Sequence, residues 1–289
     1  MTTMQATAAM IEPGIYADIG DEAYHTGPGI SKSGLDVIHR CPADYILRRE
    51  HPKGPTPAMA LGKAVHALVL EPGTFEAKFC KDEYPGSYSK EAKAWREAQL
   101  EAGRTVVQTA IDADFWDKDD WRAVYAMRDA IAAHPIASIL LNLDDGKAEQ
   151  SVFWIDQQTR KLCKCRPDFM NEAHNLCVDL KTTEDASFQG FGQSVSKYRY
   201  HVQDAFYRDG LHAIGRTVAG FIFVAVEKQP PYNVAVYRLG QEEVRTGRLQ
   251  YEDDLAKYAK CKATDTWPGY PDEIRDLTLT QYQLRGFIS

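Results

Sequence analysis

Two side chains of opposite charge lie two residues apart in the strand-like segment LCVDLK, residues 176–181. Side chains alternate between the two faces of a strand, so Asp179 and Lys181 project from the same face. The preceding segment ends in Arg-Pro-Asp-Phe, and a short turn at 171–175 would bring its Asp168 beside Asp179 if the two segments pair as strands. Glu149, one segment earlier, can add a third carboxylate.

Carboxylates gathered in this way suit a divalent metal ion. Neighbouring negative charges raise each other's pKa, and a cation relieves that repulsion. Hard oxygen ligands favour Mg²⁺, with Mn²⁺ as a substitute. Such an ion would polarise a phosphodiester and lower the pKa of a bound water, while Lys181 orients or deprotonates that water. The residues indicate phosphodiester hydrolysis, although an Asp-x-Lys pair alone is also an ordinary interaction on an exposed strand.

Helical segments on either side of these strands carry three more polar candidates. His66 follows Gly62 by four residues in the segment GKAVHALVLE, and a histidine buried in a core explains it equally well. Gln203 and Tyr207 also lie four residues apart and therefore share a helix face. By themselves they would be unremarkable on a helix surface.

The N-terminal half that must position these residues is mainly helical in pattern. Ser31 can cap a helix over 31–40, Pro42 can begin another over 42–50, and Thr56-Pro57 opens a longer one that Pro72 ends. The apolar stripe of this longer helix comprises Met59, Leu61, Val65, Leu68 and Val69. Further helices are expected over 90–101 and 111–134.

The middle of the chain is rich in strand-forming residues. We expect strands at 148–155, 162–170 and 176–181, then helices at 187–195 and 200–214, strands at 218–226 and 233–237, and a helix over 242–260. This order predicts an α+β (α/β) fold, with a central mixed sheet flanked by helices. We expect a flexible tail over 1–12, a single domain over 13–289, and a turn at 51–57.

Composition limits the kinds of function open to the chain. Its 289 residues include 34 Lys and Arg against 41 Asp and Glu, a net charge of −7, so contact with DNA must be local. Candidates for that contact are Arg40, Arg48, Arg49, Lys53, Lys161, Lys164, Arg166, Lys197, Arg199 and Arg208, each also explicable as solvated charge. Without a signal peptide or a membrane-spanning run, we expect a soluble, cytoplasmic protein.

The six cysteines are too sparse for a disulfide framework, and we expect buried, reduced thiols. The Cys163-x-Cys165 pair has no matching second pair to complete a zinc site.

The ordered motifs resemble those of a known nuclease superfamily. The set is Gly62-x-x-x-His66, Glu149, Pro167-Asp168, Asp179-x-Lys181 and Gln203-x-x-x-Tyr207, and it resembles the RecB-type branch of the PD-(D/E)XK nucleases. The stretches GIYADIGDEAYHTGPGISKSGLDVIHRCPADY and PAMALGKAVHALVLEP are more specific, and are similar to the exodeoxyribonuclease VIII (RecE) exonucleases and their phage relatives. The resemblance runs from Pro13 to Tyr237, so the role of the later segment is open.

The resemblance implies a role for each matching residue. Asp168, Asp179 and the Leu180 carbonyl would bind the metals, His66 would approach a second metal, and Glu149 would support the site directly or through water. Lys181 would position the water, and Gln203 and Tyr207 would hold the DNA near the scissile phosphate. An iron–sulfur cluster, present in some relatives, is not expected because only Cys261 lies in the corresponding late region.

The implied activity is 5′-to-3′ exonuclease digestion of linear double-stranded DNA, leaving 3′ single-stranded tails for phage or prophage recombination. Its partners would be double-stranded DNA ends, a single-strand annealing recombinase and further copies of the chain in a ring, with four subunits favoured over three. Ser31, Lys32 and Ser33 are candidates for a pocket that binds a 5′-phosphate. The alternatives are a structure-specific or repair nuclease of the same superfamily and a non-catalytic DNA-binding subunit.

Overall fold

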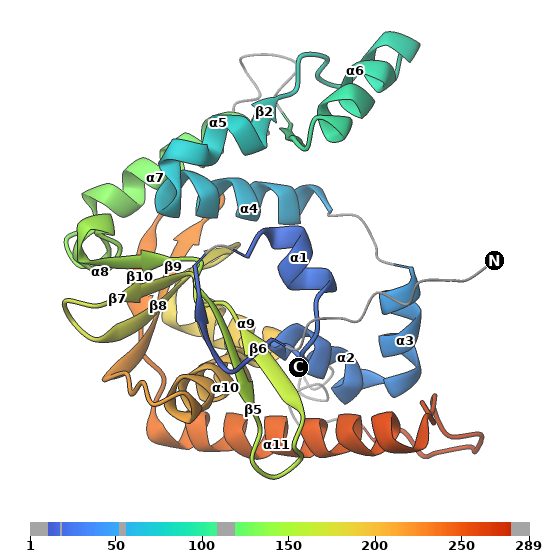
Figure 1. Cartoon of the computed structure of the whole chain (residues 1–289). Coiled ribbons are helices and arrows are strands. Elements are labelled where there is room, and N and C mark those ends of the chain that lie inside the picture. Colours follow the sequence, from blue (N-terminus) through green and yellow to red (C-terminus); the bar gives the residue numbers. More distant parts are fainter. Residues whose placement is uncertain (1–10, 18, 52–55, 109–118, 279–289) are drawn as a thin grey trace, which may run out of the picture.

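A five-stranded mixed sheet forms the centre of the protein (Figure 1), which we describe from a computed structural model covering residues 11–17, 19–51, 56–108 and 119–278. Its strand order is β10-β9-β8-β7-β4. The strands are β4 (Gly146–Ala148), β7 (Phe169–Asn171), β8 (Leu176–Thr183), β9 (Gly220–Glu227) and β10 (Val234–Tyr237). Strands β8 and β9 are parallel and the other neighbours antiparallel, so the expected mixed sheet is confirmed.

A second, three-stranded antiparallel sheet has the order β1-β5-β6. Its strands are β1 (Gly14–Tyr16), β5 (Ser151–Ile155) and β6 (Leu162–Cys165). A short parallel pair, β2 (Phe79–Lys81) and β3 (Thr105–Val107), lies apart from both.

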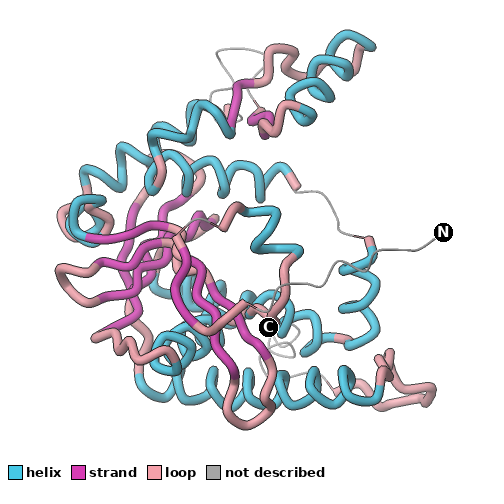
Figure 2. Tube along the Cα trace, viewed as in Figure 1, coloured by secondary structure: helices cyan, strands magenta, loops and turns pink. Residues whose placement is uncertain are grey.

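Helices cover both faces of the central sheet (Figure 2). On one face a hydrophobic core joins the sheet to α4 (Pro57–Leu70), α7 (Asp120–Ala133) and α8 (Ala137–Leu140). On the other, a second core includes β5, β6, α2 (Lys32–Arg40), α10 (Tyr200–Ala213) and α11 (Gln241–Thr264). Side chains of β8 alternate between these cores, Val178 and Leu180 in the first and Cys177 in the second. The predicted alternation that sets Asp179 on the Cys177 face is therefore confirmed.

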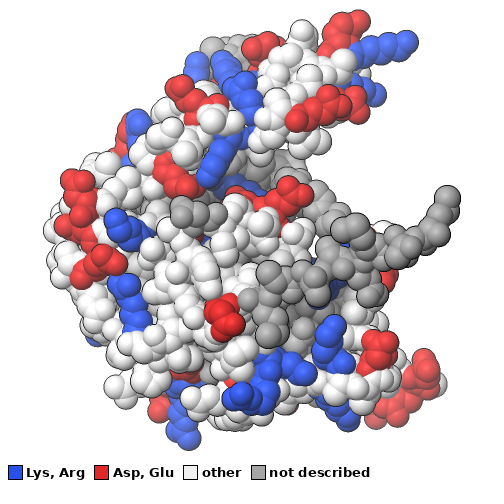
Figure 3. Space-filling view, in the orientation of Figure 1, with Lys and Arg blue, Asp and Glu red and all other residues white. Residues whose placement is uncertain are grey.

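The segment between α4 and α7 extends away from the main body (Figure 1). It contains a 3₁₀ turn (Pro72–Thr74), α5 (Phe75–Lys78), the β2–β3 pair and α6 (Lys90–Glu101). Acidic and basic side chains are interspersed over this face of the molecule, as Figure 3 shows. This distribution agrees with the modest net charge of −7.

Local sequence signals located most helices correctly. Ser31 caps α2 by accepting a hydrogen bond from the backbone of Gly34, and α3 (Pro42–Glu50) follows directly. Thr56 caps α4 in the same way. Our prediction that Met59 belongs to the apolar stripe of this helix was wrong, because its side chain is 54% exposed. The predicted helices over 90–101, 187–195 and 200–214 correspond to α6, α9 (Phe188–Tyr198) and α10.

Two segments that we predicted as single strands are each divided between the two sheets. Residues 148–155 contain the end of β4 and all of β5, separated by Gln150 and by Glu149, which has a left-handed φ of 52°. Residues 162–170 contain β6 and the start of β7, separated by Arg166, Pro167 and Asp168. Pro167 has no N–H to donate to a strand ladder, which favours a break there. The chain thus crosses from one sheet to the other at both places.

Other boundaries differ more modestly. Helix α7 begins at Asp120, and residues 111–118 of its predicted range lie outside the described part of the chain. Residues 1–10 of the predicted tail and 52–55 of the predicted turn, including Lys53, lie outside it as well. The predicted helix over 242–260 extends to Thr264, and α1 (Asp21–Thr26), β1, β2 and β3 had not been predicted. All six cysteines are buried as free thiols. Among the described helices, none has the length and apolar character to cross a membrane.

Candidate active site

The two crossings between the sheets bring a pair of acidic residues together. The backbone N–H of Glu149 donates a hydrogen bond to the carbonyl oxygen of Asp168 at 3.1 Å. Glu149 follows β4 and Asp168 precedes β7, the strand that pairs with β4. The left-handed turn at Glu149 therefore places its carboxylate at the sheet edge where Asp168 enters.

Strand pairing places the second acidic residue as predicted. Strands β7 and β8 form an antiparallel hairpin in which Phe169 lies opposite Val178, so Asp168 comes opposite Asp179. The Asp168 Oδ2 atom accepts a hydrogen bond from the N–H of Leu180 at 2.7 Å. Leu180 thus contacts Asp168 through its N–H, and metal binding by its carbonyl stays a prediction.

A glycine on α4 explains how the histidine reaches the sheet. A Cβ atom built at Gly62 would lie 3.3 Å from Oγ1 of Thr182 on β8, so glycine permits a close approach of helix and strand. His66 lies one turn later on the same helix face. Its Nδ1 is 3.4 Å from Asp168 Oδ2, which places His66 in the site rather than in the core.

His66, Glu149 and Asp168 form a cluster of possible metal ligands. One ligand atom from each lies within 4.8 Å of the others, and all three side chains are partly buried. Burial and the neighbouring Asp168 carboxylate raise the pKa of Glu149 to about 8. A divalent cation would offset both effects, so the donor set fits Mg²⁺ or Mn²⁺.

Asp179 lies at the end of this cluster, fully buried, and makes different contacts. One carboxylate oxygen accepts a hydrogen bond from Nε2 of Gln203 on α10, and the other pairs with the Lys181 ammonium. Burial and Asp168 raise the pKa of Asp179 to about 6, opposed by Lys181. Burial by itself lowers the pKa of Lys181, but the Asp179 and Asp168 carboxylates outweigh it and the net shift is upward.

Two tyrosines of α10 line the same region. Tyr207, four residues after Gln203, packs edge to face with Phe221, with 5.9 Å between the ring centroids. Burial raises the pKa of Tyr207 well above its usual value. Tyr200 had not been predicted, yet the Lys181 Nζ lies 4.9 Å from its ring centroid. The signal available in the sequence was its position three residues before Gln203 on one helix face. Contact of Gln203 and Tyr207 with DNA stays a prediction.

The three candidates for a 5′-phosphate pocket lie at the start of α2. Ser31 Oγ caps the helix and lies 3.0 Å from Ser33 Oγ. Lys32 pairs with Asp36 at 2.8 Å and also donates to the Tyr198 carbonyl at 2.6 Å. Any phosphate would therefore have to compete with the existing partners of Lys32.

Two of the basic candidates near the central strands, Lys164 and Arg166, have structural partners. Lys164 is 3% exposed and its ammonium donates to the carbonyl oxygens of Tyr24 and Gly27. The guanidinium of Arg166 donates to Ser151 Oγ and the Ile19 carbonyl, and pairs with Asp21 at 2.8 Å. Both side chains fasten the N-terminal segment to β5 and β6, a structural role that differs from both explanations offered above, DNA contact and solvated charge.

Comparison with known proteins supports this reading of the fold. A candidate exonuclease from Eubacterium rectale has a similar crystal structure, with a TM-score of 0.59 and 11% sequence identity over 94% of this chain and 97% of that one. A phage-related exonuclease from Haemophilus somnus 129PT gives a TM-score of only 0.33, at 11% identity over 70% of this chain and 94% of that one. No curated protein gives a significant sequence match. Residues 31–279 match the family described as "PDDEXK-like domain of unknown function (DUF3799)", and the chain belongs to that family within the PD-(D/E)XK superfamily.

Proposed function

We propose that this protein is a metal-dependent nuclease that hydrolyses phosphodiester bonds in DNA. The observation that carries the proposal is the convergence of His66, Glu149, Asp168, Asp179 and Lys181 around the β7–β8 pair of the central sheet. These residues come from a helix, two sheet crossings and one strand. Ordinary surface pairing would explain Asp179 and Lys181 alone, but not three carboxylates, one fully and two partly buried, together with a histidine.

The metal is proposed to be Mg²⁺, with Mn²⁺ as a substitute, held by Asp168, Glu149 and His66, with Asp179 beside them. When bound, it would polarise the phosphodiester and lower the pKa of the attacking water. Gln203 fixes the orientation of the Asp179 carboxylate through its hydrogen bond.

Lys181 is proposed to hold the attacking water. Its raised pKa keeps the ammonium protonated at neutral pH, which favours orientation of the water over its deprotonation. The Asp179 carboxylate and the Tyr200 ring hold this ammonium from two sides. Tyr207 and Gln203 are the residues we propose to contact the DNA near the scissile phosphate.

We infer further that the enzyme digests linear double-stranded DNA from 5′ to 3′, leaving 3′ single-stranded tails for recombination. This polarity rests on the resemblance of residues 13–237 to the exodeoxyribonuclease VIII exonucleases. The description of the Eubacterium rectale protein as a candidate exonuclease is consistent with exonuclease activity. A phage or prophage recombination pathway with a single-strand annealing partner would use such tails.

Digestion of end-labelled duplex DNA tests activity, metal need and polarity together. Linear duplex labelled at either the 5′ or the 3′ end is incubated with Mg²⁺, with Ca²⁺ and with chelator, beside closed circular DNA. We expect loss of the linear substrate with Mg²⁺ only, beginning at the 5′ ends. Cleavage of circular DNA would favour a structure-specific or repair nuclease, and binding without any cleavage would indicate a non-catalytic subunit.

The protein is also proposed to act as a ring, with four copies favoured, around the DNA. A chain with net charge −7 has little overall attraction for DNA, and enclosure would prevent dissociation between successive cuts. Light scattering at micromolar concentration combined with a trap-DNA chase tests this. A monomer that releases its substrate after each cut would refute the ring.

A further inference from the structure

An exposed aromatic side chain ends α9 beside the candidate active site. Tyr198 is 49% exposed, and its ring stacks on Tyr200 with 5.7 Å between centroids and 26° between planes. Tyr200 in turn contacts the Lys181 ammonium at 4.9 Å from its ring centroid. A single ring therefore separates Lys181 from an aromatic surface that reaches solvent.

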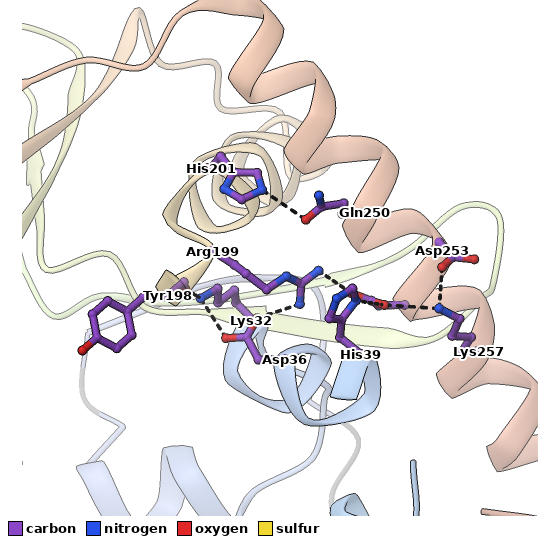
Figure 4. Close-up of polar contacts among 10 residues, drawn as sticks. Lys32, Asp36, His39, Tyr198, Arg199, His201, Gln250, Asp253 and Lys257 are labelled. Carbon is purple, nitrogen blue, oxygen red and sulfur yellow. Dashed lines mark hydrogen bonds and ion pairs between the residues drawn. The ribbon is translucent and has the colours of Figure 1, made fainter. Parts of the chain in front are cut away.

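Contacts from two other helices fix the backbone at this point (Figure 4). The Tyr198 carbonyl accepts a hydrogen bond from Lys32 Nζ at 2.6 Å. The next residue, Arg199, has a left-handed φ of 56° and forms the one-residue joint between α9 and α10. Its guanidinium donates to Asp36 on α2 at 2.8 Å and pairs with the fully buried Asp254 on α11.

This cluster makes the joint rigid while leaving the Tyr198 ring outside it. In Figure 4 the ring projects away from the charged groups that hold its backbone. A left-handed backbone is strained for arginine, so this conformation persists only because the surrounding contacts hold it. The result is an exposed ring whose position relative to Lys181 is set by the fold, which lowers the entropy lost when a ligand stacks on it.

We propose that Tyr198 is a stacking platform for a nucleobase next to the scissile phosphate, an inference that rests on the proposed nuclease function. A flat exposed ring suits any base, because every base offers a π face and stacking requires no particular sequence. An enzyme that removes successive nucleotides needs this tolerance. The Lys197 ammonium lies over the Tyr198 ring, 5.2 Å from its centroid, so a stacking base would displace it. The displaced ammonium would then supply positive charge for the adjoining DNA backbone.

Phe188, at the opposite end of the same helix, provides a matched control. It is 78% exposed, more than Tyr198, and its ring contacts Tyr237 at 6.5 Å. Ten residues of helix separate it from Tyr198, about 15 Å. Phe188→Ala therefore removes an exposed aromatic ring from α9 without touching the Tyr198, Tyr200 and Lys181 series.

The test compares wild type, Tyr198→Ala, Tyr198→Phe and Phe188→Ala. Steady-state digestion of linear duplex with Mg²⁺ gives kcat and KM, and binding with Ca²⁺ to duplex carrying terminal 2-aminopurine gives Kd and the quenching of that base by stacking. We expect Tyr198→Ala to raise KM and Kd on the order of tenfold, leave kcat within about twofold, and lose the quenching. Tyr198→Phe and Phe188→Ala should resemble wild type.

Unchanged KM and quenching in Tyr198→Ala would overturn the platform. An equal loss of affinity and quenching in Tyr198→Phe would also overturn it, because that variant keeps the ring and removes only the hydroxyl. A fall in kcat alone would also overturn it, because Tyr198 would then act through Tyr200 on Lys181. If wild type cleaves no DNA, the proposed function fails, and the quenching measured with Ca²⁺ still decides the stacking. A wild-type protein that binds no DNA would overturn both.

Discussion

Replacing Glu149 with glutamine should stabilise the metal-free protein at neutral pH. Burial and the Asp168 carboxylate raise the pKa of Glu149 from 4.5 to about 8, so the folded state favours the protonated form. The stability of the wild type therefore receives the full benefit of protonated Glu149 below pH 4.5, and it falls as pH rises toward 8. Each pH unit in that window costs the folded wild type about 1.4 kcal/mol. Glutamine keeps the shape without the charge, so Glu149→Gln should gain about 3 kcal/mol at pH 7 and under about 1 kcal/mol at pH 5.

Urea unfolding followed by tryptophan fluorescence, with chelator present, measures these free energies. The raised pKa of Asp179 also makes stability depend on pH, but its causes are burial and Asp168 rather than Glu149, so it largely cancels between the two proteins. Exposed Glu97 on α6 provides the control, because Glu97→Gln should change stability by no more than about 0.5 kcal/mol at either pH.

Metal should reduce this difference in stability at pH 7. A cation binds the ionised site, so Mg²⁺ at a hundredfold excess over its Kd should stabilise wild type at pH 7 by about 2.7 kcal/mol and the Glu149→Gln protein by less. A difference between the two proteins that is the same at pH 5 and pH 7 would refute the reasoning. So would a Glu149→Gln protein that is less stable than wild type at pH 7 in chelator.

Three further substitutions test other parts of the structure. Lys181→Ala should lower turnover on the order of a hundredfold or more while Mn²⁺ binding by calorimetry persists, whereas exposed Lys262→Ala on α11 should behave as wild type; retention within about tenfold would remove Lys181 from the mechanism. Gln203→Ala frees the buried Asp179 carboxylate and should lower kcat on the order of tenfold to a hundredfold, with little change in KM. Gly210→Ala would place a Cβ 2.6 Å from the Trp154 ring and should cost about 1 to 3 kcal/mol in thermal unfolding. Gly192→Ala, with open space around it in α9, should instead gain up to about 1 kcal/mol, and the opposite order of the two glycine variants would contradict the packing.

Local patterns were sufficient for the parts of the site that lie in adjacent segments. The alternation along 176–181 and the short turn before it fixed the relation of Asp168, Asp179 and Lys181, because both depend only on strand geometry. Helix caps at Ser31 and Thr56 likewise act within three residues of each start.

Long-range relations were harder to predict. The change of sheet at Glu149 depends on one residue with a left-handed backbone, a conformation that its residue type does not indicate. The position of Tyr200 on the Gln203 face of its helix was not sufficient to predict its role, because that role comes from the approach of Lys181 on a strand nineteen residues earlier. Lys164 and Arg166 look like surface charges in the sequence, but their partners lie near residues 19–27, in a segment we had not assigned to any element.

The two crossings between the sheets have a consequence for insertions and deletions in this family. Between β4 and β5, and between β6 and β7, the chain has only two and three residues in which to change sheets, and those residues include Glu149 and Asp168. Adding or removing one residue there would shift the following strand by one position and turn its side chains to the opposite face. The loop at 156–161, which joins β5 to β6, carries no such restriction. Length variation among relatives should therefore accumulate in that loop and be absent from the crossings.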